Sequence, residues 1–259
     1  MDIAYTVAGF SVGAIVGLTG VGGGSLMTPL LVLLFGIHPS VAVGTDLLYA
    51  AITKAGGTLA HGMKGTVDWS ITRRLAYGSI PAAALTLLVL GQLAPGGIGG
   101  ATGLIKVALG VALLLTAVAI IFRKQIQAFA LRHSDGRENP RRTATLTVVT
   151  GAVLGVLVSI SSVGAGALGV SALFFLYPRL PTLRIIGSDI AHAVPLTLVA
   201  GIGHWMLGSV DWSLLGSLLI GSLPGIWLGS HISTRVPDRV LRPILAGMLV
   251  LVGSKLIAA

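Results

Sequence analysis

The chain has 259 residues, of which 54% are hydrophobic and 10% are charged, and its mean hydropathy is +0.95. A soluble domain of this length needs more charged surface than these residues provide, so the composition excludes an ordinary soluble globule and indicates a protein of the lipid bilayer. The net charge of +9 is carried mostly in short loops between apolar segments. That pattern orients membrane helices, and it argues against nucleic acid as a partner.

Cysteine is absent from the sequence, which excludes disulfide bonds, thiolate metal ligands and cysteine catalysis. We expect neither a metal ion nor a cofactor. The chain starts Met-Asp-Ile-Ala-Tyr, without a basic residue before its first apolar run, so no cleavable signal peptide is expected.

Eight apolar segments follow one another along the chain, and a transmembrane helix needs about 20 residues. The first and fifth are too long for one helix, and small residues interrupt them at 19–25 and at 159–166. Because a glycine inside a helix costs about 1 kcal/mol relative to alanine, we expect both segments to break into two half-helices. The predicted segments span residues 5–36, 41–62, 71–91, 98–122, 144–178, 183–207, 212–231 and 238–258.

The basic loops indicate how the two broken segments cross the bilayer, since Lys and Arg accumulate on the cytoplasmic side. If each broken segment crosses once, two basic loops fall outside. If each is a re-entrant hairpin, all basic loops fall inside, and the loops near Gly36, Gly97 and Ser209, which lack Lys and Arg, fall outside. We therefore expect hairpins, and eight simple spans are the alternative. The basic loops carry Lys64, Arg73 and Arg74, the central linker, Arg179 and Arg184, and Arg235, Arg239 and Arg242.

The second half of the chain repeats marks of the first at a constant offset of 143 positions. The matching pairs are His61 and His204, Asp68-Trp69-Ser70 and Asp211-Trp212-Ser213, and Pro81 and Pro224. An odd number of crossings per repeat inverts the second repeat relative to the first. The predicted fold is an all-α integral membrane protein of two inverted-topology repeats, each a broken re-entrant helical hairpin plus three transmembrane helices. We expect a first membrane repeat at 1–122, a basic cytoplasmic linker at 123–143 and a second membrane repeat at 144–259.

A glycine-rich run and two short motifs stand out within these repeats. They are Gly20-Val-Gly-Gly-Gly-Ser-Leu-Met-Thr-Pro29, then Gly44-Thr45-Asp46 and its counterpart Gly187-Ser188-Asp189. Together they resemble the sulfite exporter TauE/SafE family, and the resemblance covers residues 10–258. It implies an anion permease for sulfite, sulfonates and other sulfur-containing anions. The second repeat departs from the glycine pattern, with Ala165 in place of Gly23 and Ser171 in place of Pro29.

An anion near the middle of a bilayer needs a positive potential without an excess of fixed charge that would trap it. A helix N-terminus supplies about half a positive charge and free N–H donors. In a hairpin the second half-helix begins at the tip, so two such N-termini would face one another. The alternative is that the glycines only permit close packing. The predicted substrate-binding residues are Gly22, Gly23, Gly24, Ser25, Lys54, Ser161, Ser162, Gly164 and Gly166.

Lys54 lies well inside the second predicted segment, where an unpaired lysine is expensive. We expect it to face the interior of the protein, where it complements the anion or carries a proton. The alternative is that its side chain snorkels to the inner membrane surface. Its counterpart in the second repeat is Thr197, so any role of Lys54 is confined to one repeat.

Five further titratable residues are candidates for gating or proton coupling: Asp46, His61, Asp189, His192 and His204. Asp46 and Asp189 are counterparts, and so are His61 and His204. Two alternatives stay open, namely that the aspartates cap helix N-termini and that the histidines anchor the protein at the membrane interface.

The sequence favours a secondary transporter of the bacterial inner membrane, because it contains no nucleotide-binding motif for a pump. Alternating access about a site at the two hairpin tips would move the anion, in the direction of export, with protons as a coupling ion. An intramembrane enzyme built on Asp189, His192 and a serine is an alternative, and so is a non-catalytic subunit of a larger complex. The glycine spacings near Gly13 and Gly151 fit either internal contacts or the face of a homodimer.

Overall fold

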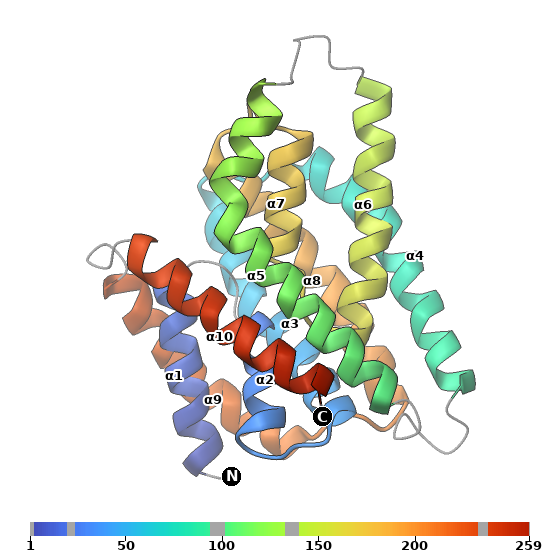
Figure 1. The fold of residues 1–259 in the computed structure, drawn as a ribbon, viewed down its shortest axis with the longest axis vertical. Coiled ribbons are helices and arrows are strands. Elements are labelled where there is room, and N and C mark those ends of the chain that lie inside the picture. The colour runs from blue at the N-terminus through green and yellow to red at the C-terminus, as the bar shows by residue number, and fades with distance from the viewer. Residues whose placement is uncertain (1–2, 20–23, 94–101, 133–139, 233–237, 259) are drawn as a thin grey trace.

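The computed structural model describes residues 3–19, 24–93, 102–132, 140–232 and 238–258, and the regular structure within these ranges is entirely helical. The helices follow the predicted apolar segments closely (Figure 1). They are α1 (Ile3–Thr19), α2 (Gly24–Leu33), α3 (Pro39–Met63), α4 (Trp69–Leu93), α5 (Thr102–Arg132), α6 (Pro140–Ser161), α7 (Ala167–Leu176), α8 (Thr182–Met206), α9 (Trp212–Ile232) and α10 (Asp238–Ala258).

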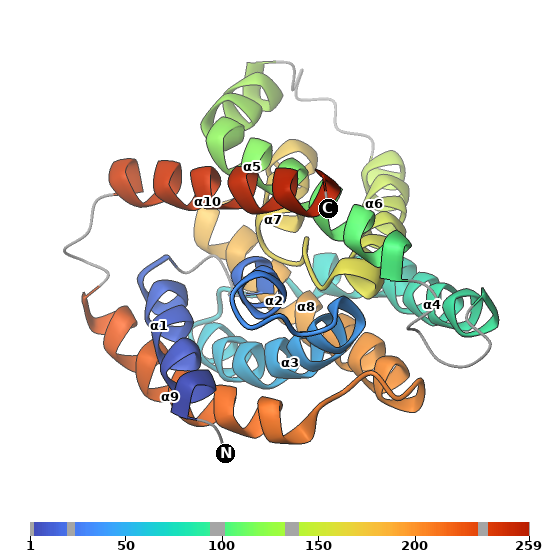
Figure 2. The same cartoon turned by 60° about the horizontal axis from the view of Figure 1, so that its bottom comes forward.

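Five of these helices are long and apolar enough to cross a membrane, namely α4, α5, α6, α8 and α9. The structure is therefore that of an all-α integral membrane protein. Helix α3 is as long as α8 but is not one of the five. It lies at the centre of the molecule beside α2 and α8, and the pairs α1–α9, α4–α6 and α5–α10 surround it (Figure 2). Because other helices cover α3, it can carry polar residues that a lipid-facing helix would exclude.

The two long segments are each divided into a longer and a shorter helix that run in opposite directions (Figure 1). In the second segment, α6 ends at Ser161 and α7 begins at Ala167. The backbone between them has positive φ at Ser162 (58°), Gly164 (121°) and Gly166 (141°), which ends the helix. In the first segment, α2 begins at Gly24, and Gly22 and Gly23 lie outside the described residues.

Helix pairs that are distant in sequence approach closely through glycine. A Cβ atom on Gly221 of α9 would collide with the carbonyl oxygen of Thr6 in α1. A Cβ atom on Gly78 of α4 would collide in the same way with the carbonyl oxygen of Val148 in α6. Gly13 and Gly151 make similar contacts with α9 and α4, so they serve internal packing and not a homodimer face.

Two turns dock onto the central helices by matching hydrogen bonds. The backbone N–H of Asp68, between α3 and α4, donates to Ser188 Oγ of α8 at 2.8 Å. The backbone N–H of Asp211, between α8 and α9, donates to Thr45 Oγ1 of α3 at 3.1 Å. The paired residues are again 143 positions apart, so the two halves of the chain use the same contact reciprocally.

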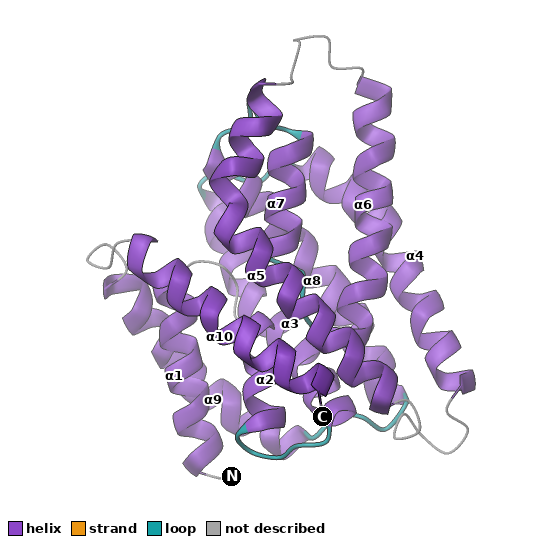
Figure 3. Cartoon of the chain, in the orientation of Figure 1, coloured by secondary structure: helices purple, strands orange, loops and turns teal. Residues whose placement is uncertain are grey.

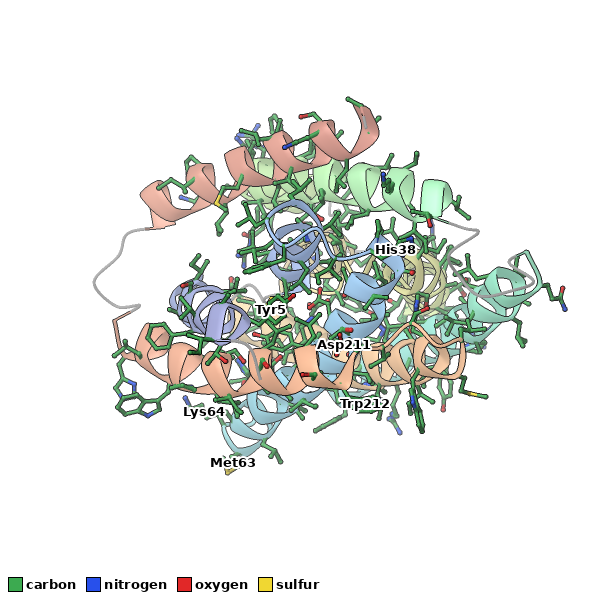
Figure 4. The ribbon with its side chains drawn as sticks, turned by 90° about the horizontal axis from the view of Figure 1, so that it is seen from below. Tyr5, His38, Met63, Lys64, Asp211 and Trp212 are labelled. Carbon is green, nitrogen blue, oxygen red and sulfur yellow. The ribbon has the colours of Figure 1, made fainter. Side chains whose placement is uncertain are left out.

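Apart from the buried connection between α6 and α7, the connecting loops that the structure describes gather at two opposite ends of the molecule (Figure 3). The connection between α7 and α8 lies at the end where α5 finishes and α6 starts, and Tyr177 there contacts both Arg74 of α4 (3.5 Å) and Thr147 of α6 (2.8 Å). The connections from α2 to α3 and from α8 to α9 lie at the other end, which Figure 4 views with His38 and Asp211 labelled. Helix α5 extends to Arg132, so the first part of the predicted linker is helical.

Candidate functional site

The connection between α6 and α7 is buried and leaves a row of backbone donors free. Residues 161–166 are all buried, and Ala167 and Leu168 are half-buried. Within the described ranges, the N–H groups of the five consecutive residues Gly164 to Leu168 make no hydrogen bond. The next two amides are satisfied, because Gly169 donates to the carbonyl of Gly164 (3.2 Å) and Val170 to that of Gly166 (2.8 Å).

Unpaired N–H groups in a buried segment are costly, since native proteins pair the great majority of them. Here they precede and open helix α7, whose N-terminus adds about half a positive charge. Gly166 is the residue before the helix, with φ 141° and ψ −96°, a conformation that side chains rarely adopt. The segment therefore has the donors, the potential and the close backbone access that a small anion requires.

Lys54 places a full positive charge at this connection. Its Nζ atom donates to the carbonyl oxygen of Ala165 at 2.6 Å, and its side chain is 7% exposed. The snorkelling alternative is wrong, because the side chain points from α3 into the protein and not to the membrane surface. Thr197, its counterpart, donates instead within α8, to the carbonyl oxygen of Ala193 at 2.8 Å.

Asp46 of α3 forms hydrogen bonds with α2 and with the connection between α6 and α7. Its Oδ2 atom accepts hydrogen bonds from Thr28 of α2 (2.5 Å) and from Ser162 (3.0 Å). Its Oδ1 atom is buried and has no partner among the described residues. Thr28 was missed by sequence reasoning, although a polar residue directly before Pro29 in an apolar half-helix was a usable signal.

Asp189 also lies inside a helix and is 1% exposed. The capping alternative is wrong for both aspartates, because α3 begins at Pro39 and α8 at Thr182, each seven residues earlier. Asp189 Oδ1 has no hydrogen-bond partner in the described part of the chain. It lies instead against Gly169 in the first turn of α7, so closely that a Cβ atom there would collide with it.

The three candidate histidines occupy different surroundings. His192 is buried, and its Nε2 atom lies 2.8 Å from Ser79 Oγ of α4. His204 is buried as well, with Nε2 2.8 Å from the carbonyl oxygen of Ser159, so it is not an interfacial anchor. His61 is half-buried at the end of α3, where its Nδ1 atom lies 2.8 Å from Thr66 Oγ1. Of these three histidines, only His192 and His204 are therefore enclosed by the helix bundle.

The remaining predicted positions differ in what they contact. Ser162 joins the cluster through Asp46, whereas the Ser161 hydroxyl donates to the carbonyl of Leu157 at 2.6 Å and stays within its own segment. Gly24 and Ser25 are the first two residues of α2. No group of three or more His, Cys, Asp and Glu side chains suited to a metal ion occurs in the part of the chain that the structure describes.

Several apolar spanning helices around a buried polar cluster are those of a multi-pass membrane protein, and comparison with known proteins gives the class as a membrane transporter. A family profile described as "Sulfite exporter TauE/SafE" matches residues 5–256. The chain belongs to the sulfite exporter TauE/SafE family. The proteins of this family are membrane transporters, so the alternative of an intramembrane enzyme is set aside.

Curated relatives carry the same description. The chain is 42% identical over 258 residues to "Probable membrane transporter protein YjnA" of Bacillus subtilis (strain 168), covering 99% of this chain and 100% of the relative. It is 28% identical over 253 residues to "Probable membrane transporter protein YdhB" of the same organism, covering 93% and 97%. It is 26% identical over 233 residues to a "Probable membrane transporter protein" of Xylella fastidiosa (strain 9a5c), covering 88% and 83%. No solved structure matches the chain significantly.

Proposed function

We propose that this transporter carries a small sulfur-containing oxyanion, such as sulfite or an organosulfonate, out of the cell across the inner membrane. The observation that carries the proposal is the row of five unpaired N–H groups from Gly164 to Leu168, with the Lys54 ammonium bonded in its midst. The row can donate several hydrogen bonds to a tetrahedral or pyramidal oxyanion, and one lysine partly neutralises its charge.

The two repeats are inverted relative to one another in this proposal. The reciprocal bonds Asp68 to Ser188 and Asp211 to Thr45 support it, and so do the two glycine crossings at Gly78 and Gly221. Contacts of this kind arise when a pseudo-two-fold axis relates the halves. In alternating access, movement of one repeat against the other then exposes the connection between α6 and α7 to each side in turn.

The basic end of the molecule faces the cytoplasm in this proposal, and two cysteine variants test it. Ser213→Cys and Arg179→Cys place a thiol at exposed positions near opposite ends, in a chain without native cysteine. In intact cells we expect an impermeant maleimide to label the cysteine at 213, and to label the one at 179 only after permeabilisation. Labelling of the cysteine at 179 in intact cells would contradict this orientation, and labelling of both cysteines from the same side would mean that α8 does not cross the membrane.

The function itself is tested by flux. We expect purified protein in liposomes to move radiolabelled sulfite or thiosulfate across the bilayer, and protein-free liposomes to remain tight. Failure to move any sulfur oxyanion would overturn the proposal. If flux then appeared only with a second membrane protein present, the chain would be a subunit of a larger complex.

A further inference from the structure

The carboxylate of Asp189 lies where the proposed anion would be bound. Gly169, the residue it touches, is the third residue of α7, next to the free N–H groups of Ala167 and Leu168. A Cβ atom on Gly169 would overlap Asp189 Oδ1 and lie 3.0 Å from its Cγ. Among the described residues, a buried carboxylate oxygen without a partner thus faces the positive end of α7, where the N–H groups of Ala167 and Leu168 also have no partner.

Few charged groups of the described residues act on this carboxylate. The charge of Lys54 on α3 interacts with Asp189, and it interacts more weakly with Asp46. Helix α7 carries no titratable acidic or basic side chain. His192 on α8 itself is held by Ser79 of α4. The arginines of the other packed helices lie near the starts of those helices, at Arg73 and Arg74 in the second turn of α4 and at Arg141 and Arg142 in the first turn of α6.

Two negative charges at one helix end repel strongly inside a bilayer, where the surroundings screen them poorly. We propose that Asp189 is the proton carrier of this transporter, because its ionised carboxylate and the bound anion compete for the first turn of α7. This inference rests on the proposed function. When the anion enters, Asp189 takes up one proton from the same aqueous phase and becomes a neutral carboxylic acid. When the anion leaves on the other side, the proton leaves with it, so one proton moves with each anion.

Asp46, the counterpart of Asp189, is not suited to this role. Its Oδ2 atom accepts two hydroxyl hydrogen bonds, from Thr28 and Ser162, and such bonds favour the charged carboxylate. Asp189 Oδ1 has no such donors among the described residues. The duplicated aspartates therefore differ in their surroundings, and the difference assigns proton exchange to the second repeat.

The inference is tested by measuring anion affinity against pH with purified protein. Thiosulfate is the probe, because its charge is constant between about pH 5.5 and about pH 8, unlike that of sulfite. Uptake of one proton per anion weakens binding about tenfold for each pH unit above the range in which the carboxyl group titrates. We expect this slope in the unmodified protein and in Asp46→Asn, and no slope in Asp189→Asn, whose neutral amide mimics the protonated acid.

A second measurement needs no variant and therefore does not depend on how well Asp189→Asn folds. Thiosulfate added to the unmodified protein in weakly buffered solution is expected to remove one proton from the solvent for each anion bound. Binding without proton uptake would overturn the inference, and so would a pH slope that persists in a folded Asp189→Asn protein. If thiosulfate and sulfite fail to bind at every pH, the proposed function fails instead.

Discussion

Replacement of Gly166 by alanine is expected to lower the affinity for the transported anion by more than about tenfold, which corresponds to about 1.4 kcal/mol. The residue has φ 141° and ψ −96° immediately before α7. A side chain in this region costs about 1–3 kcal/mol, so the backbone is expected to relax and to redirect the N–H groups that follow. Equilibrium binding of labelled thiosulfate to the purified variant measures the loss.

Gly208→Ala is the matched control for this variant. Gly208 also has positive φ, at 73°, but it lies in the turn between α8 and α9, where an added Cβ atom would meet nothing within 4 Å. Its substitution therefore introduces backbone strain, but it leaves the structure of the connection between α6 and α7 unchanged. We expect Gly208→Ala to bind the anion normally at a reduced melting temperature. Equal loss of affinity in both variants would mean that strain, and not the N–H row, governs binding.

Lys54→Met is expected to have the second large effect, a fall in anion affinity of about 10- to 100-fold. The substitution removes a buried positive charge and the bond from Nζ to the carbonyl of Ala165. A hydrogen bond to a charged group contributes about 1.5–3 kcal/mol, which sets this range. Methionine keeps much of the length and apolar character of the lysine stem, so packing changes little.

The control for this variant is Lys255→Met, which removes an exposed lysine near the end of α10. We expect unchanged affinity and unchanged flux in Lys255→Met liposomes. A Lys54→Met protein that folds and still binds thiosulfate at the original affinity would remove Lys54 from the site. It would leave the lysine with the structural role of holding the Ala165 carbonyl.

Much of the fold could be predicted from the sequence, because helix length and helix breaking are local properties. The apolar runs predicted both ends of five helices to within two residues, namely α3, α4, α8, α9 and α10. The small residues between Ser159 and Gly166 predicted the break in the fifth segment, although α6 continues to Ser161. The end of α5 was missed by ten residues, since the basic residues from Arg123 onward resemble a loop but lie on a helix that extends to Arg132.

The candidate site could be predicted only in part, because its polar contacts join residues far apart in the chain. The glycine-rich break in the fifth segment and the position of Lys54 inside the second segment could be identified from the order of residues in the sequence alone. The bond from Lys54 to Ala165 and the position of Asp189 against Gly169 depend on how α3, α7 and α8 pack. The motifs around Asp46 and Asp189 resembled helix caps, yet the helices start seven residues earlier, at Pro39 and Thr182, and carry the aspartates into the core.

The most direct test of the anion site is an anomalous diffraction map from crystals soaked in selenate, a heavier analogue of a sulfur oxyanion. We predict a selenium peak with its oxygens within hydrogen-bond distance of the N–H groups of Gly164 to Leu168, and no such peak in Gly166→Ala crystals. A selenium peak elsewhere in the bundle, with the connection between α6 and α7 unoccupied in the unmodified protein, would contradict the site proposed for this transporter.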